Sequence, residues 1–156
     1  SELTRDLSEL LPELVPALRG KVDPARALPR LAAGGSDEAA EATEGKAPRL
    51  AYHPPCTLQH GQKLRGGVEA HLRQLGFDVH VAPNESHLCC GSAGTYSVLH
   101  PEMATTLRDR KLGHLGELRP LAVISANIGC ITHLQSGTAT PVRHWVEVLD
   151  AALVPA

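Results

Sequence analysis

The sequence predicts an α/β fold: an open, mostly parallel four-stranded sheet with flanking helices, preceded by an N-terminal helix and a linker. From Arg49 onward, strand-like and helix-like segments alternate four times, as in parallel sheets whose strands are joined by helices. The segment LAVISAN, residues 121–127, has the apolar character of a strand that is buried on both faces. Gly76 and Pro120 fall where a helix is expected to end and a strand to begin.

The chain before Arg49 has a different pattern. Leucine and valine recur three and four positions apart over residues 2–19, which predicts an amphipathic helix with Pro12 and Pro16 as interruptions. Residues 20–48 are rich in alanine, glycine and glutamate, so we expect a mobile linker that buries little. The expected parts are an amphipathic helix, a low-complexity linker and a cysteine-rich α/β domain, over residues 1–19, 20–48 and 49–156.

The strands expected after the linker are short. FDVHVAP alternates apolar and polar residues, as a half-buried strand does, and RLAYH is stopped by two prolines. The four expected strands are RLAYH, FDVHVAP, LAVISAN and PVRHW, over residues 49–53, 77–83, 121–127 and 141–145. Helices are expected within residues 61–76, over 101–118 with proline in the first turn, from 129 and over 146–154.

Composition narrows the possible function classes. The chain has 156 residues, of which 42% are apolar and 3% aromatic, so one ordinary aliphatic core is expected. A formal charge of −2 with mixed signs argues against a nucleic-acid binder. No membrane-spanning run or signal peptide is recognisable, and four cysteines are too few for a disulfide scaffold. We therefore expect a cytoplasmic protein with reduced cysteines, and the missing initiator Met suggests a fragment of a longer chain.

The four cysteines follow different predicted strands. Cys56 follows the first strand, Cys89 and Cys90 follow the second, and Cys130 follows the third. The carboxyl ends of parallel strands share one edge of the sheet, so we expect all four thiols in one crevice. Each also lies near an expected helix N-terminus, where the thiolate, the form that binds metal, is favoured.

Several chemistries remain open for this cysteine group. Inert buried cysteines, a disulfide and a nucleophilic Cys–His pair fit less well than a metal site. A zinc ion could use Cys56, one of the adjacent cysteines, Cys130 and His133, one helical turn beyond Cys130. A multi-iron cluster would give both adjacent thiolates a metal atom to bind, and we favour it. His53 and His87 suit hydrogen-bonding or structural roles equally well, and His144 suits a core or capping role.

Four segments resemble a known family. YHPPCTLQHGQKL, HLCCGSAGTYSVLHPEMA, ANIGCITHL and PVRHWVEVL are similar to the C-terminal CCG (cysteine-rich) domain of the iron–sulfur subunits of bacterial glycolate oxidases. The resemblance implies that the ligands of an iron–sulfur cluster correspond to Cys56, Cys89, Cys90 and Cys130. The family pattern ends in Cys-x-x-Cys, and here His133 stands in the last place. That departure leaves a conventional [4Fe–4S] cluster, a zinc ion and a lost site open.

The resemblance also implies a cellular role. Such subunits receive electrons from flavin-containing partner subunits that oxidise glycolate to glyoxylate, and their own N-terminal half carries ferredoxin-like motifs that this chain lacks. The expected function is a metal-binding electron-transfer module of an oxidoreductase, not catalytic alone and cytoplasmic or membrane-associated through its complex. The alternative is a structural or subunit-docking module with a zinc or empty thiol site.

Overall fold

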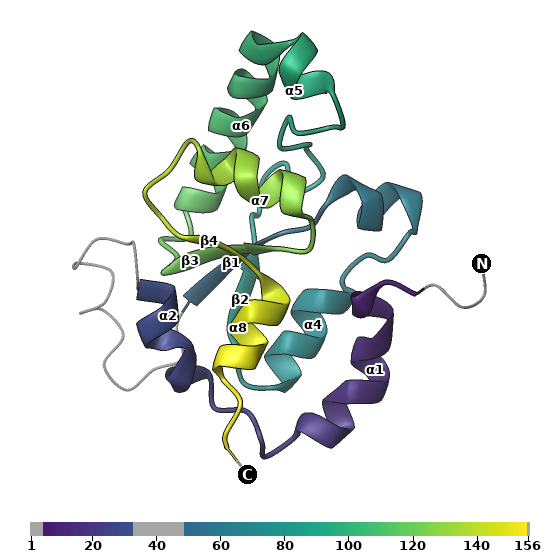
Figure 1. Cartoon of the computed structure of the whole chain (residues 1–156), viewed down its shortest axis with the longest axis vertical. Helices are drawn as coiled ribbons and strands as arrows, with labels where there is room; N and C mark the ends of the chain where they lie inside the picture. Colours follow the sequence, from purple (N-terminus) through teal and green to yellow (C-terminus); the bar gives the residue numbers. More distant parts are fainter. Residues whose placement is uncertain (1–4, 33–48, 156) are drawn as a thin grey trace.

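The computed structural model describes residues 5–32 and 49–155 and contains one four-stranded sheet (Figure 1). Its strand order is β2-β1-β3-β4, and every neighbouring pair is parallel. The strands are β1, β2, β3 and β4, over Arg49–His53, Asp78–Val81, Ala122–Ser125 and Val142–His144. The predicted α/β class, with an open parallel sheet and flanking helices, is confirmed.

Helices cover both faces of this sheet (Figure 1). The helical elements are α1 (Leu7–Leu18), η1 (Pro24–Ala27), α2 (Leu28–Ala32), η2 (Thr57–Gly61), α4 (Gly67–Gln74), α5 (Tyr96–Leu99), α6 (Pro101–Gly116), α7 (Ile128–Gln135) and α8 (Trp145–Ala151). Side chains of α1, α2, α4 and α8 pack on one face in the larger core, against Leu50 and Tyr52 of β1. Side chains of α6 and α7 pack on the other face, against Ala51 and Val123.

The alternation of side chains along β1 decides what faces the second core. Leu50 and Tyr52 belong to the larger core, and Ala51 belongs to the smaller one. Because strand side chains alternate between faces, His53 lies on the same face as Ala51. The last residue of β1 is therefore a completely buried histidine on the α6–α7 side of the sheet.

The N-terminal helix differs from the expectation. Helix α1 runs through Pro12 and Pro16 without interruption, because both prolines are exposed while Leu11 and Val15 fill the core. Asp6 starts the helix with a capping box: its side chain accepts a hydrogen bond from the Ser8 amide at 2.9 Å. A cap and a well-packed apolar face thus offset the hydrogen bonds that proline removes.

The first part of the expected linker is helical, so the expectation is wrong for residues 24–32. Asp23 caps η1, Pro24 occupies its first turn, and the buried side chains of Ala27 and Leu31 join the larger core. Val22 also forms an antiparallel bridge with Leu153, near the opposite end of the described chain. The remaining linker residues, 33–48, lie outside the described residues.

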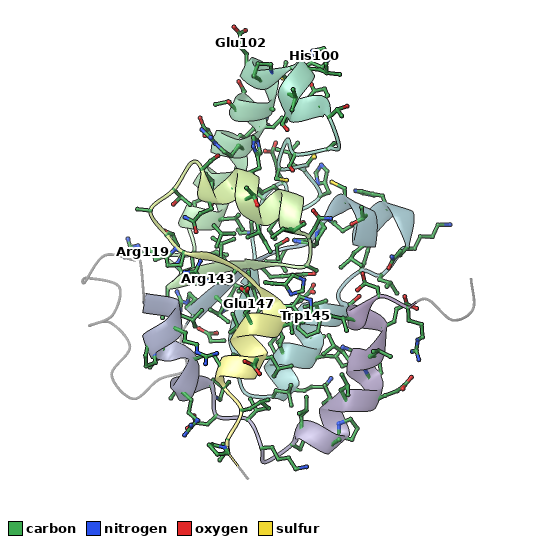
Figure 2. The ribbon with its side chains drawn as sticks, viewed as in Figure 1. His100, Glu102, Arg119, Arg143, Trp145 and Glu147 are labelled. Atoms are coloured by element: carbon green, nitrogen blue, oxygen red, sulfur yellow. The ribbon has the colours of Figure 1, made fainter. Side chains whose placement is uncertain are left out.

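The other predicted element boundaries agree closely with the structure. β1 spans the predicted residues 49–53, and α6 begins at Pro101 as expected. Helix α4 ends before Gly76, whose φ of 93° is easily adopted by glycine. α5 and the start of α6 project from the body of the protein, with His100 and Glu102 at the tip, remote from the sheet (Figure 2). Within residues 5–32 and 49–155, no helix combines the length and apolarity that crossing a lipid bilayer would require.

Candidate metal centre

The candidate site lies where the sheet changes its direction of growth. The chain passes from β1 to β2 on one side, and then to β3 on the other side of β1. Ligand sites of open α/β sheets form outside the carboxyl ends of strands at such a switch point. His53 ends β1, pairs in register with Ser125 at the end of β3, and accepts the Ser125 hydroxyl hydrogen bond on its backbone oxygen at 2.9 Å.

All four cysteines line one pocket of about 280 Å³ at this edge. The prediction that their thiols converge is therefore confirmed. Cys90 and Cys130 are buried, Cys56 and Cys89 are partly exposed, and none of the four forms a disulfide. Neighbouring thiols influence one another in series: Cys89 raises the pKa of Cys56, Cys90 raises that of Cys89, and Cys130 raises that of Cys90.

Gly91 allows the adjacent cysteines to approach helix α6. Its φ is 91°, and a Cβ at this position would lie 2.4 Å from the backbone oxygen of Ala104. The Gly91 amide also donates a hydrogen bond to the Cys89 sulfur at 3.3 Å. Glycine adopts this positive φ without strain, and a larger residue would push the loop that carries Cys89 and Cys90 (the cysteine loop) away from α6.

Helix starts position two of the four thiols. Cys130 lies in the first turn of α7, where the Asn127 side chain accepts the Cys130 amide hydrogen bond at 3.2 Å. Cys56 immediately precedes η2. Cys89 and Cys90 lie in an irregular loop before α5, so the expectation that they adjoin a helix start is wrong. The loop is instead fixed by contacts with α6.

His133 does not join the thiols. Its Nε2 lies 3.1 Å from the Ala104 backbone oxygen, and it is not part of the group of described side chains whose ligand atoms lie within 4.8 Å of one another. Three residues along a helix turn the side chain about 60° away from the direction of the first, so Cys130 and His133 face different neighbours. Packing of α7 on α6 directs His133 to Ala104, which lies beside Gly91, so His133 is a neighbour of the site and not one of the grouped donors.

His53 lies at the site instead. One ring nitrogen of His53 and the sulfurs of Cys90 and Cys130 all lie within 4.8 Å of one another. The His53 side chain is 0% exposed, and neither of its ring nitrogens has a hydrogen-bond partner. The sequence feature that could have placed His53 at the site is its position at the end of a buried strand, on the face that also carries Ala51.

The other two histidines considered from the sequence lie outside the pocket. His87 is exposed and borders a different pocket. His144 caps α8, where its Nδ1 accepts the Val146 amide hydrogen bond at 3.2 Å, which confirms the capping role.

Burial keeps the metal-free site in its neutral form. Burial, assisted by the Lys111 charge, lowers the pKa of His53 from 6.5 to about 3, so the imidazole is neutral. Burial and the neighbouring Cys89 raise the pKa of Cys56 to about 11, and the hydrogen bond to Cys130 is the largest cause that raises the pKa of Cys90 to about 11. A metal ion that binds these thiols therefore displaces protons.

Lys111 is a buried cation beside the site that sequence reasoning missed. It is 1% exposed, and its Nζ donates hydrogen bonds to the backbone oxygens of Glu85 at 2.6 Å and Ser86 at 3.3 Å. Its charge acts to lower the pKa of Cys56, against the larger effect of burial. A lysine on a predicted helix carries no sequence signal that separates this position from an exposed one.

The donor set fits a soft metal. Thiolates select zinc and iron–sulfur clusters, and neutral imidazole suits zinc and iron. Tetrahedral ligands at about 2.3 Å from zinc lie about 3.8 Å apart, so donors already within 4.8 Å need only a small contraction. A bound metal would satisfy one of the two unpartnered nitrogens of His53.

Comparison with known proteins agrees with these features. The model of the CCG family, described as a cysteine-rich domain, matches residues 50–135. The chain is 45% identical over 153 residues to the glycolate oxidase iron-sulfur subunit of Escherichia coli (strain K12), a match that covers 98% of this chain and 33% of that protein. It is 34% identical over 112 residues to lactate utilization protein A of Geobacillus kaustophilus (strain HTA426), covering 66% of this chain and 45% of that protein.

The chain thus spans less than half the length of these two relatives. The matched family segment contains all four cysteines, β2, β3 and α7, and all of β1 except Arg49. On the strength of this match and of the cysteine pocket that the segment builds, the chain belongs to the CCG cysteine-rich domain family.

Proposed function

We propose that this chain is a metal-binding electron-transfer module of a glycolate oxidase iron–sulfur subunit, with Cys56, Cys89, Cys90 and Cys130 as ligands of a [4Fe–4S] cluster. The observation that carries the proposal is the convergence of these four thiols on one pocket at the switch point of the sheet. The Escherichia coli relative is an iron-sulfur subunit, which supports the choice of cofactor.

The residues around the pocket have separate tasks in this proposal. A bound iron–sulfur cluster supplies one-electron chemistry. The burial of Cys90 and Cys130 limits the access of water to their sulfurs, and the half-buried Cys56 and Cys89 line the open side. The Lys111 ammonium offsets part of the negative charge that thiolates bring into a buried site.

The proposed partners follow from what this chain lacks and what it exposes. Its sequence has no glycine-rich nucleotide fingerprint, so we assign glycolate oxidation to flavin-containing partner subunits. We place the assembled complex in the cytoplasm or at the membrane. Ile128 directly follows the pocket residue Asn127 and is 74% exposed. An exposed apolar side chain next to a redox site is suited to contact with a partner surface.

A structural zinc module is the second candidate. The observation in its favour is the close spacing of one His53 nitrogen and the sulfurs of Cys90 and Cys130, which suits a single ion. In this role the metal would brace the loops at the carboxyl edge and pass no electron.

One experiment separates the two candidates. The chain is purified without oxygen, supplied with iron and sulfide, and analysed for iron, acid-labile sulfide, zinc and visible absorption, alongside Cys90→Ser and the exposed control His60→Ala. Near-stoichiometric iron and sulfide with reversible bleaching, lost in Cys90→Ser and kept in His60→Ala, supports the electron-transfer module. Zinc without iron supports the structural module, and equal metal content in all three proteins refutes both.

A further inference from the structure

His53 is an unusual side chain even within the buried part of the protein. It ends a central strand, is 0% exposed, and has both ring nitrogens without a hydrogen-bond partner. The nearby Ser125 hydroxyl donates to the backbone oxygen of His53, not to its ring. Among the residues that the structure describes, no other side chain has two buried polar atoms unpartnered.

This arrangement is costly unless something else binds the imidazole. A buried polar group without a hydrogen bond destabilises the folded state, because it gives up its hydrogen bonds to water and gains none in return. An apolar side chain of similar volume would avoid that loss on a sheet face that also carries Ala51 and Val123. The imidazole therefore has a use that packing alone does not supply.

The surroundings of the ring indicate what that use is. One ring nitrogen and the sulfurs of Cys90 and Cys130 lie mutually within 4.8 Å, so all three donors can reach the same metal atom. They come from β1, the cysteine loop and α7, three segments that the fold brings together independently.

We propose that His53 is a direct metal ligand, and that its imidazole binds the same metal atom as the Cys90 and Cys130 thiolates. The inference rests on the proposed metal-binding function and deepens it. The site is then a mixed imidazole–thiolate centre, and His53 fills the place that sequence spacing assigns to His133. Because imidazole is neutral, it adds a ligand to the proposed thiolates without adding negative charge to the centre.

The test uses zinc as the probe and the whole chain as the protein. Zinc affinity is measured by competition with a chromophoric chelator, without oxygen and with a thiol reductant, in the wild type and three variants. His53→Leu removes the proposed ligand while keeping an apolar side chain of similar size. His133→Ala is the matched control, and Cys130→Ser tests the underlying metal site.

The wild type and His133→Ala should bind zinc within about threefold of each other. His53→Leu should bind more weakly by at least the roughly 10–100-fold that loss of an outer hydrogen-bond partner of a ligand costs. X-ray absorption of the zinc-loaded wild type should show one nitrogen at about 2.0–2.1 Å beside sulfur at about 2.3 Å, and His53→Leu should lose that nitrogen.

Folding is checked on the metal-free proteins by chemical denaturation. His53→Leu should be at least as stable as the wild type at neutral pH, because it replaces an unpartnered imidazole. Wild-type zinc affinity in a folded His53→Leu, with weak binding in Cys130→Ser, overturns the ligand role of His53 and leaves the proposed function standing. Equal affinity in Cys130→Ser and the wild type overturns the proposed function itself.

Discussion

Acid should destabilise the metal-free protein through His53. Its pKa is lowered to about 3 in the folded state and is about 6.5 when the chain unfolds. A group with a lowered folded pKa contributes stability that is present above its unfolded pKa and is lost as the pH falls toward the folded value. The relevant window therefore lies between about pH 6.5 and pH 3.

The magnitude follows from the size of that window. Each pH unit below 6.5 costs about 1.36 kcal/mol, so at about pH 4.5 the His53 contribution to the loss of unfolding free energy is about 3 kcal/mol. The full side-chain burial means that solvent screening does little to reduce this figure. For a domain of ordinary stability this is a large fraction of the total.

Urea unfolding of chelator-treated protein at about pH 7 and about pH 4.5 measures the effect. Other groups titrate in the same range, so the His53→Leu variant is measured in parallel. The wild type should lose about 3 kcal/mol more than the variant between the two pH values. Equal losses in the two proteins would show that the imidazole is protonated in place or finds a partner, and would refute the reasoning.

Three further predictions concern the cysteine pocket. Gly91→Ala should lower the free energy of unfolding by roughly 3 kcal/mol, and Gly94→Ala, where the added Cβ meets open space, should lower it by about 1 kcal/mol. Equal small losses for the two variants in chemical denaturation would contradict the close approach of Gly91 to α6. Cys89→Ser should lose most bound metal but keep the circular dichroism spectrum of the metal-free protein, because apolar strands form the core. A metal-free protein that is unfolded by circular dichroism would contradict this view of the core. Zinc affinity should rise about tenfold per pH unit for each thiol that loses its proton on binding, since Cys56 and Cys90 have pKa values of about 11. Zinc titrations in weak buffer should therefore release protons, and zinc affinity that does not change with pH would contradict this prediction.

The sheet could be predicted from the sequence because its signals are local. Each strand is a short apolar or alternating run, and prolines follow closely after β1 and β2. The parallel arrangement follows from the helices between the strands. The linker prediction depended on average composition over residues 20–48. Two side chains, Ala27 and Leu31, are enough to anchor short helices to the core, and an average over a polar segment conceals them.

The cysteine pocket was predictable for the same reason as the sheet, because topology brings strand ends together. The position of His53 beside the cysteines was not predictable, because helical spacing made His133 the expected neighbour of Cys130. The actual direction of His133 depends on how α7 packs against α6, which involves residues distant in the sequence. The burial of Lys111 is likewise set by the loop that crosses over α6, through the carbonyls of Glu85 and Ser86.

The bridge between Val22 and Leu153 makes the folded unit larger than residues 50–135, the segment that the family model matches. Backbone hydrogen bonds from Asp23 to Ala152 and from Val154 to Lys21, both 2.9 Å, close the two ends of the domain on each other. A gene trimmed to the matched residues 50–135 would lack α1, β4 and α8, leaving the apolar strand β3 as an open edge prone to aggregation. Recombination or cloning that respects the fold must therefore cut outside the helices that precede and follow the cysteine motifs.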